Sequence, residues 1–264
     1  MERRLEIMAA GGSAPDIASL VYLWTPQLAD RGALEPVDDL YRDGFEEDVF
    51  PGAANNTWYN GHYYGLNWIN APSILYFRCD ITEEYTCKNI LSVEYYDELI
   101  EIFEAIHRTS KGSVIPFTIP ILDDELFFLF SLTPFLLSFG GGIFDETGKI
   151  ILNAQKNIEA FRWLKQFITE GHVNLTNVYS NNRQLFARGK LAFIMEGPWM
   201  RSMIPAFSGS ARTWEEHTGF MTLPKTPNGR SASVLWNHTV SIFKQCSDKA
   251  LAKEFLRYLT LDPE

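Results

Sequence analysis

Stretches with helical periodicity and short apolar stretches of strand type alternate along this sequence from one end to the other. Apolar side chains recur at helical spacing over residues 97–107, 153–171 and 248–259. Short β-prone runs cover residues 16–22 and 189–195. Because the two patterns alternate instead of falling into separate halves of the chain, the sequence predicts an α/β fold.

Single residues predict where several of these elements begin and end. Thr25 is the expected N-cap of a helix that stops at Gly32, and Asn153 is the expected cap of the helix that stops at Gly171. Pro198 follows the strand at 189–195 and is expected to start another helix. Between the glycines at 140–142 and the helix at 153, residues 142–152 read as a hairpin with an Asp-Glu-Thr-Gly turn.

Two apolar stripes are expected to face the core. In the helix at 153–171 the stripe consists of Ile158, Phe161, Leu164, Phe167 and Ile168. In the helix at 248–259 it consists of Leu251, Phe255, Leu256 and Leu259.

Charge and composition exclude several classes of protein. The 264 residues include 23 basic and 33 acidic side chains, a net charge of −10, so a nucleic acid would be repelled and is not an expected partner. A hydrophobic fraction of 46% argues against a disordered chain. No apolar run approaches the roughly 20 residues of a membrane-spanning helix. The composition predicts a soluble, acidic, globular protein.

The cysteines and the N-terminal residues say little about the compartment. Cys79 and Cys87 are close enough in sequence to close a small loop, and Cys246 lies far from both. Their spacing fits no zinc or CxxC pattern, so scattered thiols are the simpler interpretation. Residues 1–8 lack the apolar stretch of a secretory signal and instead resemble the last turns of a helix.

Common enzyme signatures are absent from the sequence. There is no GxSxG, GxxxxGK[ST] or HExxH motif, and no two histidines stand three or four positions apart. We therefore expect no metal site, no cofactor and no catalytic residue. The glycines at 140–142 lack the GxGxxG spacing and favour a backbone turn, and the adjacent carboxylates at 123–125 and 215–216 fit solvated loops. Hydrolysis nevertheless stays open as an alternative.

Tryptophans provide the positive signal. Trp24, Trp68, Trp199 and Trp236 each stand at or just past the inferred carboxyl end of a strand, the edge where open α/β sheets bind ligands. An aromatic ring packs against the C–H face of a pyranose, and nearby carboxylates and amides bond the hydroxyls. Trp163, within a helix, is instead expected to be a packing residue. The set indicates a sugar pocket.

Six segments in order carry a family resemblance. They cover residues 10–17, 28–36, 60–66, 139–148, 186–199 and 252–259. The sharpest of them reads FARGKLAFIMEGPW and ends at Trp199, while Asn67 stands where a proline is usual. In this series the chain resembles the family 1 extracellular solute-binding proteins of ABC transporters, a sugar-binding group that includes the maltodextrin-binding proteins.

The resemblance implies a fold and a division into domains. It implies the type II periplasmic-binding-protein fold, in which two α/β lobes meet at a hinge and hold ligand in the cleft. Crossing strands are expected near residues 69–76 and 233–236. Residues 1–70 with 236–264 would then form the N-terminal lobe, and residues 71–235 the C-terminal lobe.

The resemblance also implies a function and a set of ligand contacts. The expected function is binding a sugar or oligosaccharide and delivering it to the permease subunits, in the periplasm or as a cell-surface lipoprotein. Position and resemblance together single out Trp199. The full set of expected ligand-binding residues is Asp16, Tyr22, Trp24, Trp68, Asn70, Gly140, Glu196, Trp199, Trp236 and Asn237.

Departures from the family pattern leave alternatives open. The matching series starts almost at Met1, so the first strand of the N-terminal lobe and the C-terminal helices are expected to be missing. Unpaired strand edges would then favour self-association. One alternative is a non-binding remnant of a binding protein. The other is a carbohydrate-active hydrolase that uses Glu196 with a second carboxylate.

Overall fold

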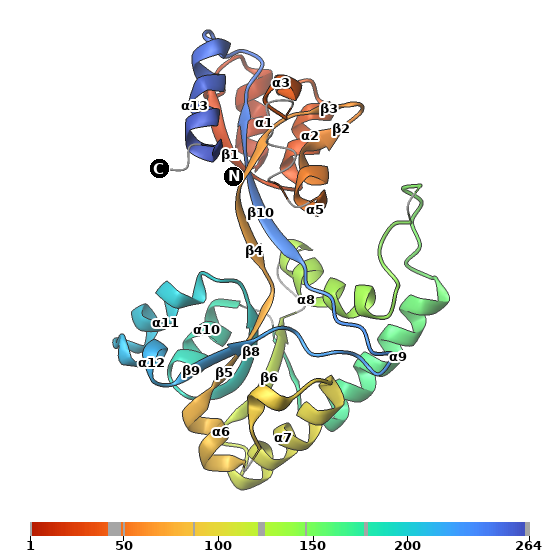
Figure 1. The fold of residues 1–264 in the computed structure, drawn as a ribbon, viewed down its shortest axis with the longest axis vertical. Helices are drawn as coiled ribbons and strands as arrows, with labels where there is room; N and C mark the ends of the chain where they lie inside the picture. The colour runs from red at the N-terminus through yellow and green to blue at the C-terminus, as the bar shows by residue number, and fades with distance from the viewer. Residues whose placement is uncertain are drawn as a thin grey trace. The chain divides into compact units, whose positions relative to one another are not determined.

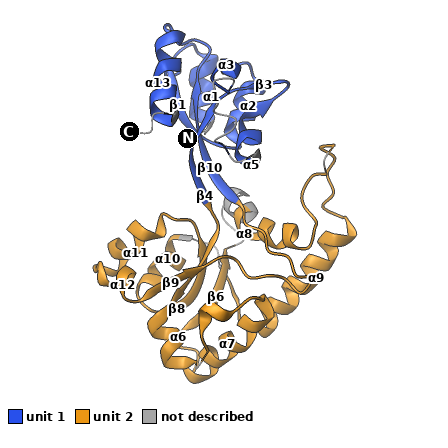
Figure 2. Ribbon diagram, viewed as in Figure 1, with its two compact units in different colours: residues 1–71, 235–264 blue, residues 72–234 orange. Residues whose placement is uncertain are grey.

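The computed structural model describes residues 2–41, 49, 51–86, 88–120, 125–145, 147–176 and 179–261. The chain divides into two compact units, shown in Figure 2. Unit 1 comprises Met1–Ala71 and Leu235–Glu264, and unit 2 comprises Pro72–Val234. Each boundary lies one residue from the position expected for it. Unit 1 is therefore built from two segments that are far apart in sequence.

The described part of unit 1 contains a three-stranded sheet (Figure 1). Its order is β1 (Ile17–Val21), β10 (Leu235–Ile242) and β4 (Leu66–Pro72), with β1 antiparallel to β10. Helices α1 (Glu2–Ala10), α2 (Trp24–Asp30), α3 (Asp38–Leu40), α5 (Pro51–Ala54) and α13 (Lys249–Leu261) accompany it. The 3-10 turn η2 (Asn55–Thr57) leads into a hairpin of β2 (Trp58–Tyr59) and β3 (His62–Tyr63).

The alternation of side chains along β1 and β10 divides the core of unit 1 between two faces of the sheet. Leu20 belongs to a cluster with Leu28 of α2 and with partly buried residues of α1. Val240 and Ile242 belong to another cluster, which includes Leu256 of α13. The sheet is thus covered by α1 and α2 on one face and by α13 on the other.

Unit 2 contains a five-stranded mixed sheet in its described residues. Its order is β7 (Asn174–Thr176), β6 (Ile115–Pro120), β8 (Leu191–Glu196), β5 (Ile74–Arg78) and β9 (Thr218–Met221). Strand β6 is parallel to β7 and β8, whereas β5 is antiparallel to β8 and β9. Helices α6 (Cys79–Tyr85), α7 (Tyr96–Thr109), α8 (Glu125–Ser138) and α9 (Gln155–Glu170) come before β7 in the chain, with the 3-10 turn η3 (Ile90–Ser92). Helices α10 (Tyr179–Ala187), α11 (Met200–Ser208) and α12 (Arg212–Glu215) come after it.

Both faces of this second sheet are also buried. Phe77 and Phe193 point to one face, where they pack in a cluster with Phe103 of α7 and with residues of α9. Tyr76 and Ile194, one position away on the same strands, point to the opposite face and pack against α10 and α11. The predicted α/β class is confirmed, and strands with helices on both faces explain why β8 is buried along its whole length.

Several predicted helix ends are wrong by one or two residues. Helix α2 begins at Trp24, and Thr25 is not its cap: the side chain is buried and its Oγ1 lies 2.6 Å from Oγ1 of Thr239. Helix α9 begins at Gln155, two residues after Asn153, and α11 begins two residues after Pro198. The predicted stop of α2 is confirmed, because Gly32 adopts a positive φ of 67° just past the helix.

The predicted apolar stripes are only partly buried. In α9, Leu164 and Phe167 face the core as expected, but Ile158 and Phe161 are 37% and 43% exposed. Asn157 and Ala160 are buried there instead. In α13, Leu256 is fully buried with Ala252, whereas Leu251, Phe255 and Tyr258 are exposed. Ile168 and Leu259 also pack against the cores, so helical spacing predicted both helices correctly and only part of the buried face of each.

The hairpin at residues 142–152 is a turn with one antiparallel bridge. Phe144 pairs with Ile150, and the Asp145 amide donates to the carbonyl oxygen of Lys149 at 2.9 Å. Gly148 takes a positive φ of 82° in the turn. The predicted turn residue Glu146 and the carboxylates at 123 and 124 lie outside the described residues.

Cys79 and Cys246 are free thiols in the part of the chain that the structure describes. Burial and the nearby acidic side chains Glu83 and Asp80 raise the pKa of Cys79. The proposed loop with Cys87 cannot be followed, because that residue lies outside the described residues.

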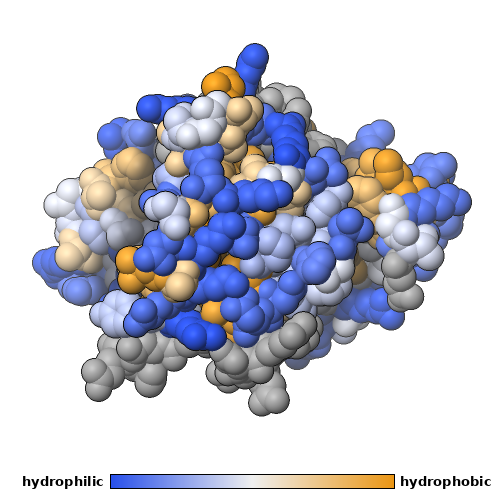
Figure 3. Space-filling model, turned by 90° about the horizontal axis from the view of Figure 1, so that it is seen from above, coloured by the Kyte–Doolittle hydropathy of each residue, from blue (hydrophilic) through white to orange (hydrophobic). Residues whose placement is uncertain are grey.

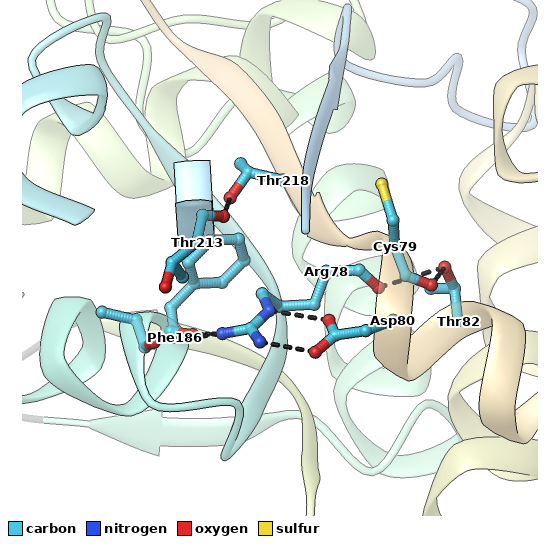
Figure 4. A network of polar contacts seen from close by, with 8 residues as sticks. Arg78, Cys79, Asp80, Thr82, Phe186, Thr213 and Thr218 are labelled. Atoms are coloured by element: carbon cyan, nitrogen blue, oxygen red, sulfur yellow. Dashed lines mark hydrogen bonds and ion pairs between the residues drawn. The ribbon is translucent and has the colours of Figure 1, made fainter. Parts of the chain in front are cut away.

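Arg78 joins three elements of unit 2, as Figure 4 shows. Its guanidinium donates to both carboxylate oxygens of Asp80 in α6, at 2.8 and 2.6 Å. It also donates to the carbonyl oxygens of Phe186 and Ala187 at 2.8 and 3.1 Å. These carbonyls end α10, and that of Phe186 also accepts from the Gly189 amide at 3.1 Å, so a buried cation helps to cap the carboxyl end of the helix.

Among the described residues, no helix is both long enough and apolar enough to cross a membrane. Figure 3 shows hydrophobic residues scattered among hydrophilic ones on the face it displays.

Candidate functional site

Aromatic side chains gather at one end of the sheet in unit 1. The antiparallel register pairs Val21 with His238, and the Tyr22 amide donates to the carbonyl oxygen of Asn237 at 3.1 Å. The rings of Tyr22 and Trp236 meet edge to face with centroids 6.1 Å apart. The carboxyl end of β1 and the amino end of β10 therefore supply this aromatic group together.

The indole of Trp236 is held by a neighbour on its own strand. Its Nε1–H donates to Nε2 of His238 at 3.0 Å, which requires that nitrogen of the imidazole to be unprotonated. Burial lowers the pKa of His238 below its ordinary value, which favours the neutral ring. His238 is two residues from Trp236 and shares its face of β10, so the strand geometry itself brings the two rings together.

Amide side chains link β10 to β4 beside these rings. Asn237 Nδ2 donates to Oδ1 of Asn70 at 3.1 Å and to Oδ1 of Asn67. Asn237 is fully buried, while Asn70 is exposed. Asn237 Oδ1 finds no hydrogen-bond partner among the described residues. Asn70 is therefore the exposed member of this amide group.

Trp68 and Trp24 have different surroundings. The Trp68 indole is 40% exposed, and its Nε1–H donates to Ser19 Oγ of β1 at 3.3 Å, across the position of β10 in the sheet. Trp24 opens α2 and packs against the cluster that contains Leu20 and Leu28. Trp68 thus offers an accessible ring, whereas Trp24 has mainly a packing role.

In unit 2, Trp199 stands in the turn between β8 and α11. Its Nε1–H donates to Glu196 Oε2 at 2.7 Å. A Cβ added to Gly197 would lie 2.4 Å from atoms of the indole, so the ring lies directly against the glycine backbone. Phe130 of α8 flanks it at a centroid distance of 6.1 Å. A part-buried ring is thereby held on rigid elements.

Glu196 is the buried acceptor that holds this ring. It is completely inaccessible and accepts from Arg183 Nε, from the Trp199 indole and, at 3.3 Å, from the Gly197 amide. Burial raises the pKa of Glu196, while the Arg183 cation and the other two donors oppose that rise. All of its described contacts are with the protein's own donors.

Gly140 belongs to the loop that follows α8. It has a positive φ of 75°, and its amide donates to the carbonyl oxygen of Leu137 at 2.9 Å, which ends the helix. Buried Asn157 then fixes the next glycines through bonds to the amide and carbonyl of Gly142, at 3.0 and 2.8 Å. The predicted backbone turn is confirmed, and these described contacts give Gly140 a conformational role.

Three features of the predicted site need correction. Asp16 precedes β1, so it lies roughly 20 Å along the chain from Tyr22, and its carboxylate interacts with the thiol of Cys246. Trp68 lies within β4 and Trp236 is the second residue of β10, so neither follows a strand end. The expectation failed because periodicity does not show how far a long strand extends.

Seven of the ten predicted residues therefore fall into two groups, one on each unit. Tyr22, Trp68, Asn70, Trp236 and Asn237 lie together on unit 1, and Glu196 and Trp199 lie together on unit 2. Asp16 stands apart. Sequence reasoning missed His238, Arg183 and Tyr76. Of these, only His238 had a visible signal, its alternation with Trp236 on a strand.

Comparison with known proteins identifies relatives of this chain. A family model described as "Bacterial extracellular solute-binding protein" matches residues 1–264. A maltotriose-binding protein of Pyrococcus abyssi is 24% identical over 200 residues, which are 75% of this chain and 41% of the relative. An arabinooligosaccharide-binding protein of Halalkalibacterium halodurans is 27% identical over 277 residues, covering 95% and 55% of the two chains. The chain spans about half the length of the curated relatives it matches.

A solved structure shows the same fold. The GacH receptor of Streptomyces glaucescens, described unliganded and in complex with acarbose and an acarbose homolog, superposes with a TM-score of 0.80. It is 22% identical, and the match covers 98% of this chain and 64% of that one. The likeness establishes the architecture expected from the sequence, the fold of the sugar-binding periplasmic proteins.

Proposed function

Because the chain belongs to the bacterial extracellular solute-binding proteins, we propose that it binds a carbohydrate and delivers it to the permease of an ABC importer. The family is extracellular, so the proposed place of action is the periplasm or the cell surface. Relatives named for maltotriose and for arabinooligosaccharides support a sugar or oligosaccharide as the ligand.

One observation carries the proposal: the Trp199 ring is held part-buried by Glu196 and lies against Gly197. A fixed aromatic face can pack against the C–H face of a pyranose without losing freedom on binding. On unit 1, the exposed ring of Trp68 offers stacking and the exposed amide of Asn70 offers hydroxyl recognition. We propose that each unit, taken by itself, offers side chains suited to a sugar.

The proposed activity is binding without chemical conversion. Glycoside hydrolysis needs a pair of carboxyl groups that flank the scissile bond. Glu196, the carboxylate that the hydrolase alternative requires, is inaccessible and accepts from Arg183 and Trp199. Its contacts favour a supporting role over acid–base chemistry.

Calorimetric titration tests the proposal. The chain is titrated with maltotriose, an arabino-oligosaccharide, glucose and the polyol sorbitol, and the sugars are analysed by chromatography afterwards. We expect saturable 1:1 binding of at least one oligosaccharide, recovered intact. Saturable binding of sorbitol alone would mean that the ligand is a polyol and not a sugar. Recovery of shortened sugars would support the hydrolase alternative. The absence of any saturable heat would support the non-binding remnant.

A further inference from the structure

The Trp199 ring is restrained in two independent ways. Contact with Gly197 holds the six-membered ring of the indole close to the backbone, since the ring occupies the space of a Cβ at that position. The hydrogen bond from Nε1 to Glu196 Oε2 determines how the ring is rotated within its own plane. Together these contacts restrain the position of the indole.

Glu196 needs both of its oxygens to be acceptors. Oε1 accepts from Arg183 Nε, and Oε2 accepts from the Trp199 indole and the Gly197 amide. A glutamine at this position has one acceptor oxygen and one NH₂ donor. In either orientation that NH₂ would face a donor, Arg183 on one side or the indole on the other. The site therefore requires a carboxylate and not merely a hydrogen-bonding side chain.

Arg183 orients this carboxylate from a neighbouring element. It projects from α10, and its side chain is only 13% exposed, so its attraction to Glu196 is little screened by solvent. The carboxyl end of α10 is in turn fixed by Arg78 through the carbonyl oxygens of Phe186 and Ala187. The position of Arg183 is thus set by the packing of α10 on the sheet.

Tyr76 supports the same turn from the adjacent strand. Its hydroxyl donates to the carbonyl oxygen of Gly197 at 3.2 Å, and its backbone pairs with Ile194 of β8. Burial and the nearby charge of Glu196 raise the pKa of Tyr76 to about 12, so the hydroxyl stays a donor at neutral pH. This bond fixes the glycine against which the indole lies.

We propose that Arg183, Glu196 and Tyr76 are positioning residues that hold the Trp199 indole ready for stacking, and that they set ligand affinity without touching the ligand. The inference rests on the proposed function for its effect on affinity. The restraint on the ring itself holds with or without sugar, so the two are tested separately.

Fluorine NMR of chain labelled with 5-fluorotryptophan measures the restraint directly. The Trp199→Phe variant assigns the Trp199 resonance by its disappearance. Arg183→Met and Glu196→Gln should shift that resonance towards the position of free 5-fluorotryptophan and lower sugar affinity about five- to twentyfold. Arg183→Lys keeps a cation beside Glu196 and should restore the parent resonance and an affinity within about threefold.

Two further variants keep the test decisive if Arg183→Met does not fold. Gly197→Ala leaves the ion pair intact and displaces the ring by steric overlap, so it should shift the same resonance. Glu94→Gln removes the carboxylate of another ion pair in unit 2, that of Lys225, and should leave the Trp199 resonance unchanged.

The outcomes separate the two proposals. If Arg183→Met and Glu196→Gln leave the Trp199 resonance at its parent position, the positioning role is overturned. If the resonance moves but the affinity of the folded variants does not change, the effect on binding is overturned. If the parent chain binds none of the sugars, the proposed function fails, and the fluorine spectra alone decide whether these residues hold the ring.

Discussion

At the scale of single residues, three tryptophans of the candidate site differ in the group that accepts the hydrogen bond of the indole N–H. Trp199 donates to Glu196, Trp236 to His238 and Trp68 to Ser19. The acceptors are a carboxylate, an imidazole nitrogen and a hydroxyl oxygen. We therefore expect substitutions and changes of pH to affect the hydrogen bonds of the three rings differently.

Replacement of Trp199 by alanine should weaken sugar binding. By analogy with base stacking on aromatic side chains, loss of the ring costs about 1–3 kcal/mol. This corresponds to roughly a ten- to hundredfold rise in Kd. The measurement is calorimetric titration with the oligosaccharide that the parent chain binds best.

The control for this variant is Trp163→Phe. Trp163 stacks on Phe167 at a centroid distance of 5.1 Å and donates to Asp97 at 3.1 Å, so it packs against the core of unit 2, as predicted. The control should lower stability and leave the affinity of the folded fraction unchanged. Parent-like affinity in Trp199→Ala would contradict the assignment of Trp199 to the ligand.

His238 should make the stability of the chain depend on pH. Its pKa is lowered by burial in the folded state, whereas the unfolded chain titrates near the ordinary value of 6.5. Below that pH the unfolded chain binds a proton that the folded chain resists, so the free energy of unfolding falls as pH falls. Protonation also removes the acceptor of the Trp236 indole.

The variant His238→Gln isolates this effect, because glutamine offers an acceptor and does not titrate. Urea unfolding of parent and variant is compared at pH 7.5, 6.5 and 5.5. The parent should lose stability relative to the variant at the two lower values. Parallel curves for the two proteins across this range would refute the assignment.

At the scale of elements, the rotation of α13 is the clearest departure from the pattern in the sequence. Leu256 is fully buried in unit 1, whereas Phe255, one position earlier, is 47% exposed. Helix propensity and periodicity are compatible with either rotation, and packing against β10 selects the one observed.

Alanine substitution should distinguish these two neighbours. Leu256→Ala removes a fully buried side chain and should lower the free energy of unfolding by roughly 2–5 kcal/mol. Phe255→Ala, at a half-exposed position, should cost much less. Urea unfolding monitored by circular dichroism provides the comparison, and equal losses would show that the helix packs through a different face.

At the scale of the whole molecule, the two units have separate cores, and they differ in whether a single segment of the chain forms them. Unit 2 is one segment, whereas unit 1 joins residues 1–71 to residues 235–264 through the pairing of β1 and β10. Contacts between residues over 200 positions apart, such as Thr25 with Thr239, therefore hold unit 1 together.

Sugar binding should stabilise the folded chain by mass action. At a free sugar concentration of 100 times Kd, the free energy of unfolding should rise by about 2.7 kcal/mol. For Trp199→Ala, the same concentration should give about 0.4–1.4 kcal/mol, since its Kd is ten- to hundredfold higher. Thermal unfolding with and without sugar measures both gains, and an equal gain in the two proteins would speak against stacking on Trp199.

The sequence by itself determined the class of fold, the placement of the main helices and strands, and the choice of Trp199 as the ligand contact that we propose. These depend on local patterns: apolar periodicity, glycine at helix ends, and a motif of fourteen neighbouring residues, 186–199. Local patterns survive in the folded chain because hydrogen bonding and side-chain direction within a helix or strand repeat over a few residues.

Only the tertiary structure decided which side chains support the site. Arg183 and Tyr76 reach Gly197 and Glu196 from α10 and β5, and Asn67 and Asn70 meet Asn237 across more than 160 residues of chain. The tertiary structure also buried Glu196 and separated Asp16 from the aromatic group of Tyr22 and Trp236. Strand register and helix rotation are set by contacts distant in sequence, and no local pattern contains them.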